Sequence, residues 1–260
     1  MEKQELKDLT VSVYERLKKV IEAGDKKQAI AMVVEMEKNK RDFDDSYRQW
    51  IDLMLTYVAD KLGEDAVYEV HRLNGERALW PRMGWIYSDM SIEDKVRRRA
   101  YTWTDWHMDN LTEITEDDEK FAFKMKVCLS GGRIRNWPVH GETREAHDWS
   151  FGQKGISLYC AHCATVLEKM GIEKMGYPAW IADIQPGGGC IQYIYKDPAR
   201  IPDKYYERSG MKKGPVKQTG AALKPADVKK KPAAKAKTKT AAVKKTATAK
   251  KATRTKKTGK

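Results

Sequence analysis

The segment Ala179–Pro198, AWIADIQPGGGCIQYIYKDP, contains two short runs rich in isoleucine and aromatic residues. The runs Ala179–Gln185 and Cys190–Tyr195 have the composition and length of β-strands. Pro186-Gly187-Gly188-Gly189 joins them, and a short glycine-rich connection is typical of a hairpin between antiparallel strands. Lys196-Asp197-Pro198 ends the second run. The segment therefore predicts an antiparallel β-element.

The residues before this hairpin extend the prediction to an α+β fold. Phe121, Phe123 and Met125 alternate with small or basic residues, which predicts a strand with one buried face over Phe121–Val127. Apolar residues at helical spacing predict five helices, over residues 11–21, 29–36, 50–58, 66–79 and 156–170. We expect a helical region, residues 1–110, packed with an antiparallel-sheet α+β domain, residues 111–205.

Several local patterns set the expected helix ends. Gly24-Asp25 and Gly63 should end the first and third helices, and Gly171 should end the last. Ser91–Asp94 has the pattern of a capping box, which opens another helix reaching about Met108. The stretch Trp80–Trp85 contains proline and glycine and should interrupt the helical pattern.

Charge separates the last fifty residues from the rest. Met211–Lys260 holds 18 Lys and Arg side chains and one acid, Asp227, a formal charge of +17. Since the whole chain carries +13, residues 1–210 carry −4. The segment has no aromatic residue, and it cannot bury enough apolar area to offset the entropy of ordering it. We therefore expect residues 206–260 to form a disordered tail.

Such a tail is suited to a polyanion. It resembles the Lys/Ala/Pro/Thr-rich C-terminal tails of linker histones and bacterial histone-like proteins, which implies DNA binding without base recognition. Lysines neutralise phosphates and release counterions, whereas stacking on bases requires aromatic side chains. The alternatives are another polyanion, such as anionic lipid, or a purely solubilising role. The candidate nucleic-acid contacts are Lys229, Lys230, Lys231, Lys244, Lys245, Lys250, Lys251, Arg254, Lys256 and Lys257.

The expected compartment is the cytoplasm, with the tail adding association with the nucleoid. Met1-Glu2-Lys3-Gln4 opens an amphipathic pattern rather than a secretory signal, and no stretch is long and apolar enough to span a bilayer. Four cysteines in such a chain favour a reducing compartment. They are then free thiols, catalytic groups or metal ligands rather than structural disulfides.

The four cysteines all fall in the second half of the chain, at the ends of predicted elements. Cys160 and Cys163 stand three residues apart, a spacing that lets two thiolates bind one tetrahedral metal ion. Cys128 and Cys190 would complete a four-thiolate zinc site, so we expect all four to lie close together. Two alternatives remain open: a reactive Cys160 activated by a helix N-terminus, or buried cysteines acting as small hydrophobic residues.

Other polar candidates lie on the long irregular stretch from Arg135 to Gln153 and beside it. A loop of this length in a compact domain is more often functional than not. His140, His147 and His162 are alternative nitrogen donors for a metal, and the catalytic candidates are Cys160, His140, His147 and Arg133. His71 and His107 lie within helical patterns, which favours packed or surface histidines over ligands.

Three short motifs carry a resemblance to a known family. The phrases Val127–Arg133, VCLSGGR; Tyr159–Cys163, YCAHC; and Cys190–Pro198, CIQYIYKDP, resemble a prokaryotic group similar to the L-2-amino-thiazoline-4-carboxylic acid hydrolases. The order of elements also resembles the 4-vinyl reductase domain, a small-molecule-binding α+β module. The likeness covers roughly Leu111–Pro202. It implies that the four cysteines line a ligand or metal pocket and that Arg133 meets a substrate carboxylate.

Two classes of function follow for the body. In one, it is a zinc- or small-ligand-binding domain that the tail tethers to nucleic acid. In the other, it is a hydrolase of a small carboxylated cyclic substrate, with a Cys/His or zinc site. Three protein ligands plus water would favour catalysis, whereas four thiolates favour a structural or binding site. A purely architectural chromatin protein would explain the tail but not the Trp- and Cys-rich body.

The tail should account for nucleic-acid binding by the full chain. Lysine lacks the planar guanidinium group with which arginine forms two hydrogen bonds to one base, so we expect little sequence preference. Engagement of about 8–10 phosphates would give a log–log salt slope of roughly −7 to −9 on duplex DNA. Residues 1–210 alone should lose this binding. Equal affinity of the two proteins, or a flat salt response on unrelated duplexes, would reduce the tail to a solubility segment.

Overall fold

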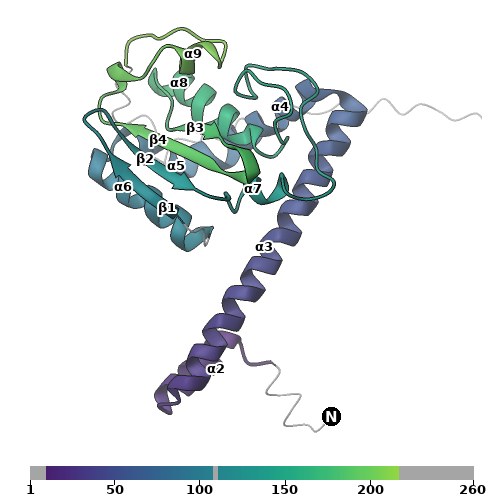
Figure 1. Cartoon of the computed structure of the whole chain (residues 1–260), viewed down its shortest axis with the longest axis vertical. Helices are drawn as coiled ribbons and strands as arrows, with labels where there is room; N and C mark the ends of the chain where they lie inside the picture. The colour runs from purple at the N-terminus through teal and green to yellow at the C-terminus, as the bar shows by residue number, and fades with distance from the viewer. Residues whose placement is uncertain (1–9, 108–110, 217–260) are drawn as a thin grey trace, which may run out of the picture. The chain divides into compact units, whose positions relative to one another are not determined.

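A four-stranded antiparallel sheet is at the centre of the fold (Figure 1). The computed structural model describes residues 10–107 and 111–216, without the side chains of residues 85–88 and 106. The strands are β1 (Leu111–Glu116), β2 (Lys120–Met125), β3 (Ile181–Ile184) and β4 (Cys190–Tyr195), in the order β1-β2-β4-β3. The predicted hairpin is therefore confirmed as β3–β4, and the α+β class with it.

Strand β1 was not expected from the sequence. Its residues, LTEITE, include only two apolar side chains, and the strand lies at an edge of the sheet, where its burial is slight. The turn into β2 is fixed by Asp117, whose Oδ1 accepts hydrogen bonds from the backbone N–H groups of Glu119 and Lys120, both at 2.8 Å. An edge strand with one weakly buried face leaves little periodic signal in the sequence.

The helices before the sheet differ in their bounds from those expected. They are α2 (Val13–Glu22), α3 (Lys26–Leu62), α4 (Glu64–Asn74), α5 (Trp80–Ser88) and α6 (Ile92–Tyr101). The helices predicted over 29–36 and 50–58 are one continuous helix, α3. Its middle, Glu37–Asp45, is too polar to show an apolar stripe, yet it contains no glycine or proline to end a helix. The expected end at Gly63 and the Ser91 cap of α6 are confirmed.

Two of the predicted helix boundaries were wrong. Trp80–Trp85 does not interrupt the helix: a single π-helical turn, η1 (Gly75–Leu79), leads directly from α4 into α5, and Pro81 lies within this continuous helical run. The last helix does not begin at Ile156 but at the π-helix η3 (Cys163–Lys169), which continues as α8 (Met170–Met175).

Gly171 does not end that helix, because its role is packing. A Cβ at Gly171 would lie 2.5 Å from the backbone N of Ala179, so only glycine lets the helix approach the chain that leads into β3. The helix ends instead at Gly176, whose φ of 86° places it in the left-handed region typical of a C-terminal cap.

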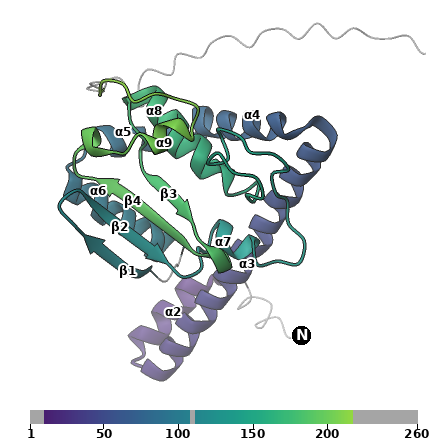
Figure 2. The ribbon, with the colours of Figure 1, turned by 45° about the horizontal axis from the view of Figure 1, so that its top comes forward.

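The sheet and the N-terminal helices share a core, so the described parts of the predicted regions 1–110 and 111–205 form one compact unit. The face of the sheet that carries Phe123 and Ile194 packs against Trp80 of α5, Val166 of η3 and Met170 of α8. Figure 2 shows α5 and α6 on the far side of the strands. No helix in residues 10–107 or 111–216 is long and apolar enough to cross a membrane.

The folded part of the chain continues beyond residue 205, the predicted end of the α+β domain. A short helix, α9 (Lys204–Glu207), buries Tyr205 and Tyr206 against Ile181 of β3. Further along, the Lys213 Nζ donates to the carbonyl oxygens of Ala199 and Ile201. A truncation that tests the tail should therefore follow Val216 rather than Gly210. Residues 217–260, with all ten candidate nucleic-acid contacts, lie outside the described residues.

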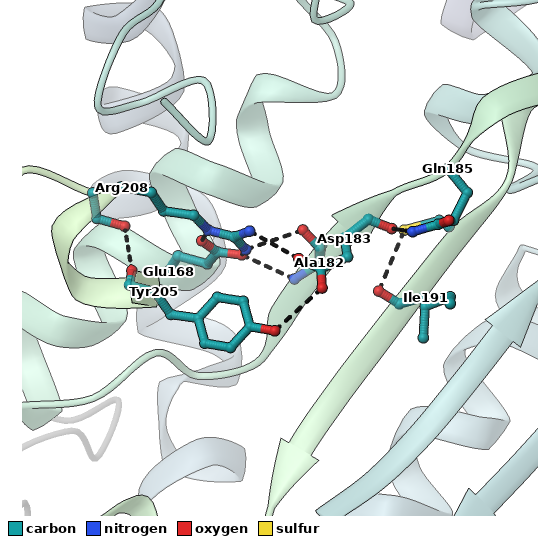
Figure 3. Close-up of polar contacts among 9 residues, drawn as sticks. Glu168, Ala182, Asp183, Gln185, Ile191, Tyr205 and Arg208 are labelled. Atoms are coloured by element: carbon teal, nitrogen blue, oxygen red, sulfur yellow. Dashed lines mark hydrogen bonds and ion pairs between the residues drawn. The ribbon is translucent and has the colours of Figure 1, made fainter. Parts of the chain in front are cut away.

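A buried ion cluster attaches this C-terminal segment to the core (Figure 3). The Arg208 guanidinium donates to both carboxylate oxygens of Glu168, at 2.9 and 2.5 Å, and to Asp183 at 2.8 Å. Glu168 also accepts the backbone N–H of Ala182 at 2.9 Å, and the Tyr205 hydroxyl donates to Asp183. Helix η3, strand β3 and the C-terminal segment are thereby joined through one carboxylate that is 1% exposed.

Replacing Arg208 should destabilise the body strongly. Burial raises the pKa of Glu168 to about 7, and the Arg208 charge opposes that shift. In Arg208→Met the carboxylate is left buried without its cation, at a cost of about 3–5 kcal/mol. Thermal unfolding should therefore move down by about 6–20 °C at pH 8. The loss should shrink towards pH 5, because the folded state then gains a proton on Glu168 before the unfolded state does.

Two further variants make this measurement specific. Arg200→Met removes an exposed arginine paired with Glu119 and should change stability by no more than about 0.5 kcal/mol. Glu168→Gln combined with Arg208→Met should recover part of the loss, since no buried charge remains. An Arg208→Met protein as stable as the parent at pH 8 would contradict the assigned role of the cluster.

Candidate functional site

A cavity of about 500 Å³, partly open to solvent, lies between α3, α4, α5, α6 and η3. We call it the aromatic chamber, because the indoles of Trp80, Trp103 and Trp180 form much of its wall. Its other lining residues are Ile51, Leu55, Val70, His71, Asn74, Leu79, Met83, Arg99, Thr102, His107, Ser130, Tyr159, His162, Cys163, Val166 and Leu167. The N-terminal helices supply most of these side chains, although the catalytic and metal-binding residues predicted from the sequence all lie in the second half of the chain.

Each π-helix of the described structure contributes to this wall. Helix η1 supplies Leu79, η2 (Thr102–Trp106) supplies Thr102 and Trp103, and η3 supplies Cys163, Val166 and Leu167. A π-turn inserts one residue into an α-helix and rotates the following side chains, and such turns are frequent at functional sites. Because all three π-helices line the chamber, their irregular turns help to keep the surrounding helices apart and so to form the cavity.

Arg99 is the cation of the chamber. It is buried on α6, with its guanidinium 3.8 Å from the ring centre of Trp180 and 4.4 Å from that of Trp103. It donates to the side-chain oxygen of Gln192 on β4, which also accepts the indole N–H of Trp103 at 3.2 Å. The two indole rings and the hydrogen bond to Gln192 hold the charged guanidinium in one position in a mostly apolar space.

Three histidines line the chamber, and burial keeps them neutral. Desolvation lowers the pKa of His71 to about 4 and that of His107 to about 3, and it also lowers the pKa of His162. The nearby cations Arg99 and Arg48 further disfavour a charged His107. His71 Nε2 donates to the carbonyl of Leu158 at 2.8 Å. Neutral imidazoles in this position can donate or accept hydrogen bonds to a ligand without adding charge.

The four cysteines lie around a second, much smaller cavity, which we call the thiol cavity. Cys128, Cys160, Cys163 and Cys190 all line this space of about 20 Å³, enough for one water-sized particle. The expected convergence is therefore observed. Gly131 makes it possible, because a Cβ there would lie 2.2 Å from the Cys160 sulfur.

Burial disfavours the thiolate form of three of these cysteines. Burial raises the pKa of Cys160 and of Cys163 to about 12, and it raises the pKa of Cys190 well above its ordinary value. Arg135, which also lines the cavity, opposes the shift at Cys160 but directs its hydrogen bonds to the carbonyls of Gln185 and Gly189. Among the described residues, no group of three or more His, Cys, Asp or Glu side chains has the geometry of a metal site.

Cys163 and His162 join the two cavities, since both residues line each of them. His162 Nδ1 donates to the carbonyl of Tyr159 at 2.6 Å, which leaves Nε2 of the neutral ring as an acceptor. The Cys163 sulfur lies 3.4 Å from that Nε2, so the thiol can donate to it. A ligand in the aromatic chamber would meet this Cys–His pair at one end.

The other sequence candidates lie outside both cavities. His140 bonds to the Trp137 carbonyl and to Glu142. His147 pairs with Glu64 at the start of α4 and stacks on Trp149, with ring centres 4.5 Å apart. These contacts anchor the irregular stretch to the N-terminal helices.

Arg133 likewise forms an ion pair with Asp45 of α3. The cation expected to meet a carboxylate is therefore paired with Asp45, whereas the arginine that lines the chamber is Arg99, which is itself hydrogen-bonded to Gln192. Two residues judged to be packing histidines, His71 and His107, do line the chamber. The sequence shows only that the run Arg97-Arg98-Arg99 precedes the tryptophan-containing Tyr101–Trp106, and it does not show which arginine is buried.

Comparison with known protein families, with curated proteins and with solved structures gave no significant match. The resemblance to the thiazoline-carboxylate hydrolases and to the 4-vinyl reductase domain therefore stays a prediction.

The zinc hypothesis also stays a prediction, and metal analysis tests it. If the four thiolates bind one zinc ion, the purified protein should contain about one zinc per chain. Each single Cys→Ser change at positions 128, 160, 163 and 190 should lower metal content and melting temperature together, because metal binding is coupled to folding. Uptake by the metal-free protein should release protons, since burial holds the thiols protonated.

A donor outside the thiol cavity provides the control. His140→Gln should retain the full metal content. A folded, metal-free protein with four thiols that react only after unfolding would show that the cysteines are packing residues. Loss of metal in only three of the four Cys→Ser variants would point to a three-ligand site with an open position.

Proposed function

We propose that the body binds a small, flat carboxylated molecule in the aromatic chamber. The observation that carries the proposal is a buried cation, Arg99, held between two indoles in the wall of a cavity of about 500 Å³. Cavities of roughly 300–1,000 Å³ with apolar walls and a few placed polar groups are the usual sites of small ligands. The resemblance noted in the sequence also implies a small carboxylated ligand.

The charge of the lining favours an anion. Its residues include one arginine and three histidines, and none of the described lining residues is acidic. A guanidinium binds a carboxylate through two parallel hydrogen bonds, which a neutral amide cannot match. The neutral imidazoles and the hydroxyls of Ser130 and Tyr159 provide further hydrogen-bonding groups for the body of the ligand.

The aromatic walls favour a planar ring. Trp80, Trp103 and Trp180 present flat faces, and Trp80 is fixed by a hydrogen bond from its indole N–H to the Val166 carbonyl at 3.0 Å. Stacking on such faces contributes about 0.5–1.5 kcal/mol for each aromatic pair beyond the burial of area. A heterocyclic carboxylate has the charge and the ring that these features favour; 2-amino-thiazoline-4-carboxylate adds a flat N–C–S unit, although its C4 is tetrahedral.

Hydrolysis is the second candidate, and the contact between Cys163 and His162 is the observation in its favour. A thiol beside an imidazole acceptor is the arrangement of a cysteine nucleophile and its base. However, burial raises the pKa of Cys163 to about 12 and lowers that of His162, so the neutral pair predominates. A thiolate would require the bound ligand to change this environment. Binding therefore comes first in the proposal, and turnover second.

The basic tail completes the proposed function in the cytoplasm. Its formal charge of +17 stands against −4 for the rest of the chain. A tether of this charge would hold the ligand-binding body near DNA or another polyanion, with strong dependence on salt.

Ligand binding can be followed through the fluorescence of the chamber tryptophans. Aromatic carboxylates, and the non-aromatic ring acid 2-amino-thiazoline-4-carboxylate, should bind at least about 10-fold more tightly than their neutral amides, because a charge-assisted pair contributes about 1.5–3 kcal/mol. Arg99→Met should abolish this preference. Arg99→Lys should retain part of it, since the charge remains without the planar fork.

Arg97→Met is the matched control on the same helix. Arg97 is exposed and paired with Asp94, so its loss should leave both affinities unchanged. Equal affinity for acids and amides in the parent protein, or an unchanged preference in a folded Arg99→Met variant, would overturn the proposal. Product formation that Cys163→Ser abolishes, with ligand affinity retained, would identify the protein as the hydrolase.

A further inference from the structure

Helix α3 has two apolar faces, and the body covers only one of them. The covered face carries Leu55 and Ala59, which are buried, with Asp52 accepting the backbone N–H of Gly141. At 100° per residue, the residues Phe43, Tyr47, Trp50, Met54 and Tyr57 lie on roughly the opposite face. We call these five residues the α3 stripe. A surface helix is normally polar on the side away from its core, so an apolar stripe there requires a partner.

The α3 stripe is exposed and continuous. Its four aromatic side chains are each more than half exposed, and Met54 is 43% exposed. Phe43 stacks on Tyr47 with ring centres 6.2 Å apart, and Tyr47 meets Trp50 edge-on at 5.8 Å. Contiguous apolar patches of this kind on a folded protein mark interaction sites more often than chance placement.

The spacing of the stripe is that of a coiled-coil seam. Its residues follow one another at intervals of four, three, four and three, the alternation of a and d positions in a heptad. Such a seam is complementary to another helix with the same spacing. The chain itself supplies one in a second copy, through a twofold axis that brings the same patch of both copies together.

We propose that the α3 stripe is the interface of a homodimer, with two α3 helices packed against each other. Four aromatic side chains of about 150–250 Å² each, more than half exposed, together with Met54 and the neighbouring Leu53, present on the order of 600 Å² per copy. A biological interface should bury at least about 1,000 Å² in total, or about 500 Å² per partner, so the stripe exceeds the area that a dimer needs at minimum.

Charges at the two ends of the stripe favour antiparallel pairing. Parallel, in-register helices would place Lys40 against Lys40 and Lys61 against Lys61 at seam positions. Antiparallel helices centred on Trp50 instead bring Lys40 of one copy near Asp60 of the other, because both lie ten residues from the centre. Within one chain, Lys40 contacts the Asp105 carbonyl and Asp60 pairs with Arg144, so this pairing adds to contacts that each side chain already makes. Trp50 then faces its own symmetry mate, where aromatic residues contribute most to binding.

Other segments of the chain are poorer occupants for this surface. Met1–Leu9 contains only three large apolar residues, Met1, Leu6 and Leu9, too few to cover four aromatic rings. Residues 217–260 contain no aromatic side chain and are rich in lysine. Dimerisation would also bear on the chamber, because Ile51 and Leu55, which line it, lie on the same turns of α3 as Trp50 and Met54.

Sedimentation or light scattering of the full chain over a range of concentrations tests the proposal. The parent protein should be a dimer at micromolar concentration, with a melting temperature that rises with concentration. Trp50→Glu should raise the dimer dissociation constant at least about 30-fold, the effect expected for a central anchor. Tyr47→Glu should act in the same direction, which covers the case in which one variant fails to fold.

Val34→Glu is the matched control, since Val34 is an exposed apolar residue of α3 that lies off the stripe. It should leave the dimer intact. A parent chain that stays monomeric at all concentrations would overturn the proposal, and so would a dimer that survives both stripe variants in folded form. A monomer that dimerises only after deletion of Met1–Leu9 would also overturn it, and would show that the chain covers its own stripe.

Discussion

One buried carboxylate, Glu168, determines how three parts of this fold meet. It accepts the forked hydrogen bonds of Arg208 and the backbone N–H of Ala182, so the π-helix, the edge strand β3 and the C-terminal segment share a single polar centre. Such a group is tolerated in a core only when every partner is in place. The same π-helix turns Cys163, Val166 and Leu167 towards the aromatic chamber, so the geometry of the chamber rests on this centre.

The two cavities show how burial sets chemical character. In the aromatic chamber, desolvation keeps three imidazoles neutral, while Arg99 keeps its charge because a guanidinium is far harder to deprotonate. In the thiol cavity, the same desolvation raises the pKa of Cys160, Cys163 and Cys190. The result is one fixed cation among neutral hydrogen-bonding groups, which suits the recognition of a small anion better than proton transfer in the unliganded protein.

Some of the site was predictable from the sequence. The four cysteines flank predicted strands and helices, and residues at element ends often converge, so their meeting at one cavity could be expected. The role of Arg99 could not, because nothing in Arg97-Arg98-Arg99 shows which side chain turns inwards. His71 and His107 have the same ambiguity: a histidine on an amphipathic helix faces either a core or a cavity, and only the packing of neighbouring helices decides between them.

The sequence by itself determined the β3–β4 hairpin, the α+β class, the cap at Ser91 and the charge contrast between body and tail, because strand period, capping and charge are local properties. Tertiary structure alone decided that Gly171 is a packing glycine and not a helix end, and that α3 is continuous through its polar middle. It also decided that Tyr206 and Arg208 belong to the core. These outcomes depend on contacts between residues far apart in the chain. Such contacts stabilise one arrangement over another without producing a recognisable pattern in the local sequence.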